Sequence, residues 1–241
     1  MDAIRIGMIL PSSNTVVEPV CIAIAARLPG ISVHFSRFAL TAVKVEDPAA
    51  AYYDSGALLG AARLLADARC HVICWNGSAG GLVGLERDRR LCRDIEAATG
   101  TPATTSSLAL VAQFRRTGVE RFGMVTLNPP EMNEIIKRNF AAEGFTCVAA
   151  TSRAGVTDNF AMADVAPEEI AALAGDCVRA ATVAPDALIV YGTNTRGAPV
   201  AAGLSVKLGL PVYDSVVWGM IEALLTLNID IGPLTTLEFT P

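Results

Sequence analysis

The feature that most constrains the fold of this chain is an internal repeat. Residues 5–11 read RIGMILP and residues 121–127 read RFGMVTL, and further matches follow each of them in the same order. These further matches pair residues 72–78 with 188–194, and residues 100–102 with 209–211. Three matches in constant order, between 109 and 116 residues apart, favour a duplicated unit over the general likeness of α/β units. The sequence therefore predicts two similar halves related by a pseudo-two-fold axis.

Short apolar strands alternate with amphipathic helices in each half. This alternation is typical of a parallel sheet with helices on both faces. Several predicted helices stop at a glycine, such as Gly100, Gly118 and Gly209, which suits the left-handed C-terminal cap. We therefore expect an α/β fold with two pseudo-symmetric Rossmann-like (flavodoxin-like) halves and an active site in the cleft between them. We expect residues 1–105 plus 216–241 to form the first half, and residues 106–215 the second.

Composition and charge exclude several classes of function. The chain has 241 residues, of which 52% are hydrophobic and 18% charged, and a formal net charge of −5, which offers no surface for nucleic acid or anionic membranes. No apolar run reaches the roughly 18–20 residues of a membrane span, and the first residues do not resemble a secretion signal, so a cytoplasmic protein is expected. Six cysteines without a C-x-x-C pair, and only two histidines, argue against a structural zinc site.

Small polar residues follow four of the predicted strands. They are PSSNT at 11–15, NGSAGG at 76–81, LNPP at 127–130 and GTNTR at 192–196. Ligands of open parallel sheets bind at the carboxyl ends of the strands, and backbone N–H groups at the following helix suit an anion such as a carboxylate. Each segment taken alone could equally be an ordinary helix N-cap. The candidate substrate-binding residues here are Ser12, Ser13, Asn14, Asn76, Gly77, Ser78, Asn128, Gly192, Thr193 and Asn194.

These segments resemble the aspartate/glutamate racemase superfamily, in the branch that contains maleate cis–trans isomerase and arylmalonate decarboxylase. The resemblance is carried by residues 7–15 with Glu18, and by residues 101–106, 155–159, 186–196 and 209–215. It covers nearly the whole chain and adds Asn159 to the candidate substrate-binding residues. It implies a cofactor-independent reaction on a small carboxylate, and a homo-oligomer. It also implies two cysteines, one from each half, that face each other across the substrate; arylmalonate decarboxylase keeps only the second.

This sequence departs from the family pattern at both thiol positions. Gly77 and Gly192 stand where the resemblance places the cysteines, and Asn128 stands where family members have a tyrosine. Glycine can neither attack nor carry a proton, so chemistry with two thiols is unavailable in this alignment. The two glycines are expected to open space on both faces of the substrate, for a water or a bulkier acid. Cys74, three residues before Gly77, is the remaining alternative thiol, although its place in an apolar strand favours a core residue.

Four residues are candidates for acid–base chemistry: Glu18, Asp158, Tyr191 and Asp214. Glu18 could instead stabilise the first turn of a helix, and Asp214 could cap the last one. We expect a cofactor-independent enzyme of the isomerase, decarboxylase or hydrolase type, which acts on a small carboxylic or dicarboxylic acid in a catabolic pathway without paired cysteines. The alternative is a non-catalytic accessory or sensor protein that binds a carboxylate.

Overall fold

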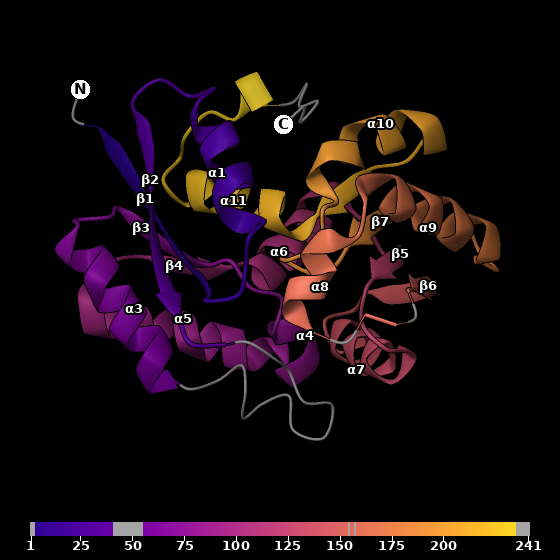
Figure 1. The fold of residues 1–241 in the computed structure, drawn as a ribbon, viewed down its shortest axis with the longest axis horizontal. Helices are drawn as coiled ribbons and strands as arrows, with labels where there is room; N and C mark the ends of the chain where they lie inside the picture. Colours follow the sequence, from indigo (N-terminus) through magenta and orange to yellow (C-terminus); the bar gives the residue numbers. More distant parts are fainter. Residues whose placement is uncertain (1–2, 41–54, 154, 157, 235–241) are drawn as a thin grey trace.

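Two parallel sheets with the same strand order form the framework of the molecule (Figure 1). The computed structural model describes residues 3–40, 55–153, 155–156 and 158–234. The first sheet has the order β2-β1-β3-β4 and contains β1 (Ile4–Pro11), β2 (Ile31–Phe38), β3 (Val72–Trp75) and β4 (Ala103–Thr105). The second has the order β6-β5-β7-β8 and contains β5 (Arg121–Thr126), β6 (Thr146–Ser152), β7 (Ala187–Val190) and β8 (Val212–Asp214). The predicted α/β fold with two pseudo-symmetric halves is confirmed.

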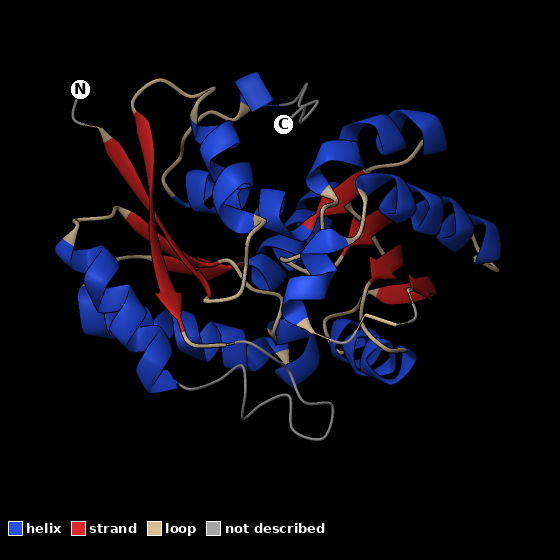
Figure 2. Cartoon of the chain, in the orientation of Figure 1, coloured by secondary structure: helices blue, strands red, loops and turns tan. Residues whose placement is uncertain are grey.

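Helices cover both sheets (Figure 2). Along the chain, the following helices lie between the strands of the first sheet or directly after them: α1 (Val17–Ala25), α3 (Ser55–Asp67), α4 (Gly80–Val83), α5 (Leu85–Thr99) and α6 (Ser106–Thr117). The second is accompanied by α7 (Pro130–Ala141), α8 (Asn159–Asp164), α9 (Pro167–Ala180), α10 (Ala198–Leu208) and α11 (Ser215–Thr226), before a 3-10 turn, η1 (Gly232–Leu234). Gly100, Gly118 and Gly209 cap α5, α6 and α10 in the left-handed conformation, as predicted.

Two helices follow a strand of one sheet in the chain but pack on the other sheet. Helix α6 follows β4 of the first sheet, but its Leu110 and Phe114 pack with Phe122 of the second sheet. Helix α11 follows β8 of the second sheet, but its Met220 and Leu224 join the core of the first. The two helices also contact each other. The predicted division at residues 105 and 215 assigns each helix to the sheet that it covers, and remains an interpretation of where the halves end.

Two searches of the described residues found nothing. No described helix is at once long and apolar enough to cross a membrane. Within the same residues, no group of three or more histidine, cysteine, aspartate or glutamate side chains could hold a metal ion.

Candidate functional site

The loop after β1 and the loop after β7 are joined by hydrogen bonds between the halves. Asn14 donates from Nδ2 to the carbonyl oxygen of Thr193 at 2.9 Å, and the Thr15 N–H donates to Asn194 Oδ1 at 3.0 Å. Asn159, at the start of α8, donates to Ser13 Oγ at 2.7 Å and accepts at its carbonyl from Asn194 Nδ2. The structure therefore brings together five of the predicted binding residues: Ser13, Asn14, Asn159, Thr193 and Asn194.

Asn14 also fixes the start of helix α1. Its Oδ1 accepts from the N–H groups of Val16 and Val17 at 3.0 and 2.9 Å. The sequence predicts a helix from residue 14, whereas α1 begins at Val17, because the side chain of Asn14 takes the place of the preceding turn. The capping alternative therefore applies to Asn14, which is fully buried and serves the helix and the second half at once.

Ser12, Ser13 and Glu18 also have partners within the first half. The hydroxyls of Ser12 and Ser13 donate to the carbonyl of Leu40 at 3.4 and 2.7 Å. Glu18 forms an ion pair with Arg37 at 2.9 Å, and Arg37 Nη1 also donates to the carbonyls of Ser12 and Asn14. Arg37, which the sequence did not single out, therefore fixes the loop after β1, and Glu18 holds Arg37.

Asn76 and Asn128 lie at the ends of β3 and β5. Asn76 is fully buried, donates to the carbonyl of Val216 at 3.2 Å and accepts from Ser106 Oγ at 2.9 Å. It therefore joins β3 to the first turns of α6 and α11. The half-buried Asn128 donates its backbone N–H to Thr126 Oγ1 at 3.2 Å.

Tyr191 links the end of β7 to the first half. Its buried hydroxyl donates to the carbonyl of Ser78 at 2.8 Å and accepts from the Gly81 N–H at 2.9 Å. Ser107 Oγ lies 2.7 Å from the same hydroxyl. A hydroxyl with three partners in the interior holds the halves together, so its proton is not available without breaking a buried hydrogen bond. Ser107 is a further residue that sequence reasoning missed.

The two glycines at the thiol positions are crowded, and the prediction that they open space on both faces is wrong. A Cβ built on Gly77 would lie 2.1 Å from Cζ2 of Trp75, whose ring fills that side. A Cβ built on Gly192 would lie 2.8 Å from Thr195 Oγ1, and Gly192 has a φ of +149°, a conformation that other residues rarely adopt. No side chain, and therefore no thiol, fits at either position without a shift of these neighbours or of the backbone.

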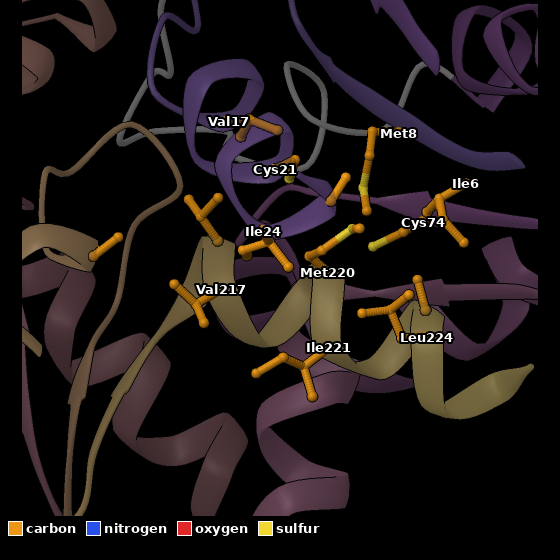
Figure 3. Packing of buried hydrophobic residues seen from close by; sticks show 14 of the residues in the cluster. Ile6, Met8, Val17, Cys21, Ile24, Cys74, Val217, Met220, Ile221 and Leu224 are labelled. Atoms are coloured by element: carbon orange, nitrogen blue, oxygen red, sulfur yellow. The ribbon is translucent and has the colours of Figure 1, made fainter. Parts of the chain in front are cut away.

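Cys74 and Cys21 belong to the apolar core of the first half. Figure 3 shows both thiols among Met8, Ile24 and Met220. Both side chains are fully buried, and this burial raises the pKa of each thiol well above its ordinary value. A thiol in such surroundings stays protonated and packs as a small apolar residue, which is the interpretation that the sequence favoured for Cys74.

The remaining acid–base candidates, Asp158 and Asp214, are both helix caps. Asp158 is exposed and accepts from the Ala161 N–H at 2.8 Å. Asp214 is buried, and its Oδ1 accepts from the N–H groups of Val216 and Val217 in the first turn of α11, as the capping alternative predicts. Its Oδ2 has no hydrogen-bond partner among the described residues. Burial raises the pKa of this carboxyl to about 7, against the opposing effect of the two N–H donors.

These features define a class of protein. Two duplicated α/β halves, joined through polar loops at the carboxyl ends of their strands, are the architecture of the Asp/Glu racemase type. The chain belongs, more closely, to the arylmalonate decarboxylase family, whose model matches residues 6–235. A comparison with curated protein sequences found no match.

Solved structures with the same fold include isomerases and a decarboxylase. Maleate isomerase from Pseudomonas putida S16 has a TM-score of 0.85 and 23% identity, over 95% of this chain and 94% of its own. A maleate cis–trans isomerase variant from Nocardia farcinica, with a covalently bound succinylcysteine intermediate, has a TM-score of 0.85 and 24% identity, over 95% and 94%. An arylmalonate decarboxylase variant in the liganded form has a TM-score of 0.80 and 25% identity, over 92% of each chain.

Two of these structures bear on the thiol positions. The Nocardia protein forms its intermediate on a cysteine. The arylmalonate decarboxylase variant carries a glycine-to-cysteine and a cysteine-to-serine change, so that enzyme naturally has one glycine and one cysteine at the altered positions. Hydrolysis, which the sequence left open, has no counterpart among these three proteins.

Proposed function

We propose that this protein is a cofactor-independent enzyme of the isomerase or decarboxylase type, which acts on a small carboxylic or dicarboxylic acid without a thiol. Its family supports the reaction class and the acid. The observation that carries the absence of a thiol is that glycines stand at residues 77 and 192, where a Cβ would fit only with a shift of Trp75, of Thr195 or of the backbone. We place the acid where the polar loops after β1, β3 and β7 meet. We also propose that the reaction serves a catabolic pathway and that the protein is a homo-oligomer.

No other cysteine is suited to replace the missing thiols. All six thiols are free, and burial raises the pKa of each of them, to about 12 for Cys92 and for the half-buried Cys147. Cys74 is the nearest in sequence to Gly77, but it lies among core side chains. Thiolate is the reactive form, so these cysteines are poor bases and poor nucleophiles at neutral pH.

Asp214 is the best proton carrier among the four predicted residues. Glu18 is committed to an ion pair, Tyr191 to three buried contacts, and Asp158 caps an exposed helix. Asp214 keeps one oxygen without a partner, and a carboxyl with a pKa of about 7 exchanges its proton near neutral pH. In a decarboxylation, loss of CO₂ leaves an enediolate that needs one proton, and in an isomerisation a proton or a water must add and leave.

One observation favours the alternative of a protein that binds an acid without turning it over. The side-chain amides predicted to hold the acid already bind groups of the other half, as with Asn14 and Thr193 or Asn194 and Thr15. An acid that adds to this network as a bridge would stabilise the closed arrangement of the halves. A sensor protein would then respond to the binding of the acid alone, without any reaction.

A ligand panel followed by a turnover assay separates these functions. We expect maleate or methylmalonate to raise the melting temperature saturably, with about 2.7 kcal/mol of stabilisation at a concentration 100 times the Kd. Chloride and sulfate at matched ionic strength are the controls. If neither acid nor any related mono- or dicarboxylate shifts the melting temperature, the proposed carboxylate site is wrong.

Turnover is then followed by proton NMR of the acid. We expect product formation to survive treatment with iodoacetamide, because no thiol takes part, and to be lost in Asp214→Asn, which keeps an oxygen to cap α11. Inactivation by iodoacetamide, with protection by the acid, would contradict a reaction without a thiol. Saturable binding without any product would support the non-catalytic alternative.

A further inference from the structure

Three buried side-chain atoms lack a hydrogen-bond partner within the described part of the chain. They are Trp75 Nε1, Thr195 Oγ1 and Asp214 Oδ2. Trp75 is 0% exposed and Thr195 is 1% exposed. An unpaired polar group in the interior costs about 1–3 kcal/mol, so native structures seldom keep one without a reason such as a ligand.

Two of these atoms lie beside the two glycines that stand at the thiol positions. A Cβ built on Gly77 would lie 2.4 Å from Trp75 Cε2, the ring carbon bonded to Nε1. A Cβ built on Gly192 would lie 2.8 Å from Thr195 Oγ1 itself. The indole ring that carries one unpaired N–H and an unpaired hydroxyl therefore lie beside the two places that the family resemblance assigns to thiols.

The backbone around both glycines belongs to the same junction between the halves. Tyr191, directly before Gly192, donates to the carbonyl of Ser78, directly after Gly77. Asn14, from the loop after β1, donates to Thr193, directly after Gly192. The backbone N–H of Asn76 in turn bonds to the carbonyl of Ile9 in β1. The ends of β1, β3 and β7 are thus tied to one another around the two glycines.

We propose that the Trp75 indole N–H and the Thr195 hydroxyl donate hydrogen bonds to the bound acid, one from each half. This inference rests on the proposed carboxylate site and names two of its donors. An indole N–H can only donate, and a hydroxyl can donate to an oxygen, so the pair matches the acceptor oxygens of a carboxylate. The Trp75 ring also closes the side of Gly77 against any nucleophile, which selects acids whose reaction needs no covalent bond to the protein.

The indole N–H can be observed directly, because the chain has only two tryptophans, Trp75 and Trp218. Protein labelled with ¹⁵N gives two indole signals, and Trp218→Phe identifies the signal of Trp75. On titration with maleate or methylmalonate, we expect the Trp75 indole proton to shift with the same Kd as the thermal stabilisation. The Trp218 signal, whose ring packs on Tyr213, is the internal reference.

Thr195→Val is the matched test of the hydroxyl. Valine has nearly the same shape, and the hydroxyl has no partner in the protein, so the stability without ligand should stay unchanged. We expect the Kd of the acid to rise about 10- to 100-fold, as for loss of a hydrogen bond to a charged group. Thr195→Ser, which keeps the hydroxyl, should bind within about threefold of the unaltered protein.

The outcomes separate this inference from the proposed function. If an acid binds but the Trp75 signal stays fixed at saturation, or Thr195→Val binds as tightly as the unaltered protein, the two donors are wrong and the carboxylate site stands. If no acid stabilises the protein and neither indole signal moves, both the site and its donors are overturned.

Discussion

Removal of the Tyr191 hydroxyl should loosen the junction between the halves. In Tyr191→Phe, the Ser78 carbonyl and the Gly81 N–H both lose a buried partner. Each buried group left unpaired costs about 1–3 kcal/mol, so we expect a loss of about 2–6 kcal/mol in the free energy of unfolding. For a chain of this length, that loss corresponds to a fall of roughly 4–24 °C in the melting temperature. The ring and its edge contact with Phe140 are kept.

Tyr213→Phe is the control for this experiment. Tyr213 is also buried, but its hydroxyl lies 3.5 Å from both Gln113 Nε2 and Thr117 Oγ1, at the limit of hydrogen bonding. Its removal should therefore cost less than about 1 kcal/mol. Urea denaturation followed by circular dichroism gives both values. Equal losses in the two variants, or a loss below about 0.5 kcal/mol in Tyr191→Phe, would refute the role assigned to the Tyr191 hydroxyl.

Three further changes test other parts of the structure. Because Asp214 has a folded pKa of about 7, above its ordinary value of 3.8, its protonated form stabilises the fold below about pH 4, and this contribution is lost as the pH rises to 7. Thermal melts should show that the free energy of unfolding falls by a few kcal/mol over this pH range in the unaltered protein but not in Asp214→Asn. The same pH dependence in both proteins would contradict the raised pKa of this buried carboxyl. Gly77→Ala should lower the free energy of unfolding by about 1–3 kcal/mol, because the new Cβ meets the Trp75 ring. Gly60→Ala places its Cβ in open space inside a helix and should raise the free energy of unfolding by up to about 1 kcal/mol. Denaturant midpoints of the two variants measure this difference. Asn14→Ala should lose about 1–3 kcal/mol and Asn14→Ser distinctly less, because serine can still cap α1; equal losses would assign the effect to the bond with the second half.

Local signals in the sequence were enough for most of the fold. The C-terminal ends of α5, α6 and α10 are predictable from the sequence, because each helix stops at a glycine in a left-handed cap. Strand β4 was missed since it has only three residues, and α4 was missed since it begins with two glycines. The start of α1 was predicted too early because the side chain of Asn14 replaces a turn of helix.

The candidate site was less predictable because its contacts join distant parts of the chain. The polar strand ends could be recognised in the sequence, but not that Tyr191 meets Ser107, 84 residues away. The crowding at Gly77 was also hidden. Periodicity indicates that Trp75 is buried in a strand, but not that its ring lies against Gly77, two residues further along the chain. Such rotamer choices depend on the surrounding packing, here the edge contact with Phe38.

The exchange of α6 and α11 between the halves has a consequence for synthesis on the ribosome. The chain emerges from its N-terminus, so β1, β3 and α1 exist long before Met220 and Leu224, which complete their core. Until then, the apolar face that α11 covers stays open to water or to a chaperone. A nascent chain that ends just before residue 215 should therefore hold all described strands of the second half but remain unfinished in its first, so the half that is synthesised first should be completed last.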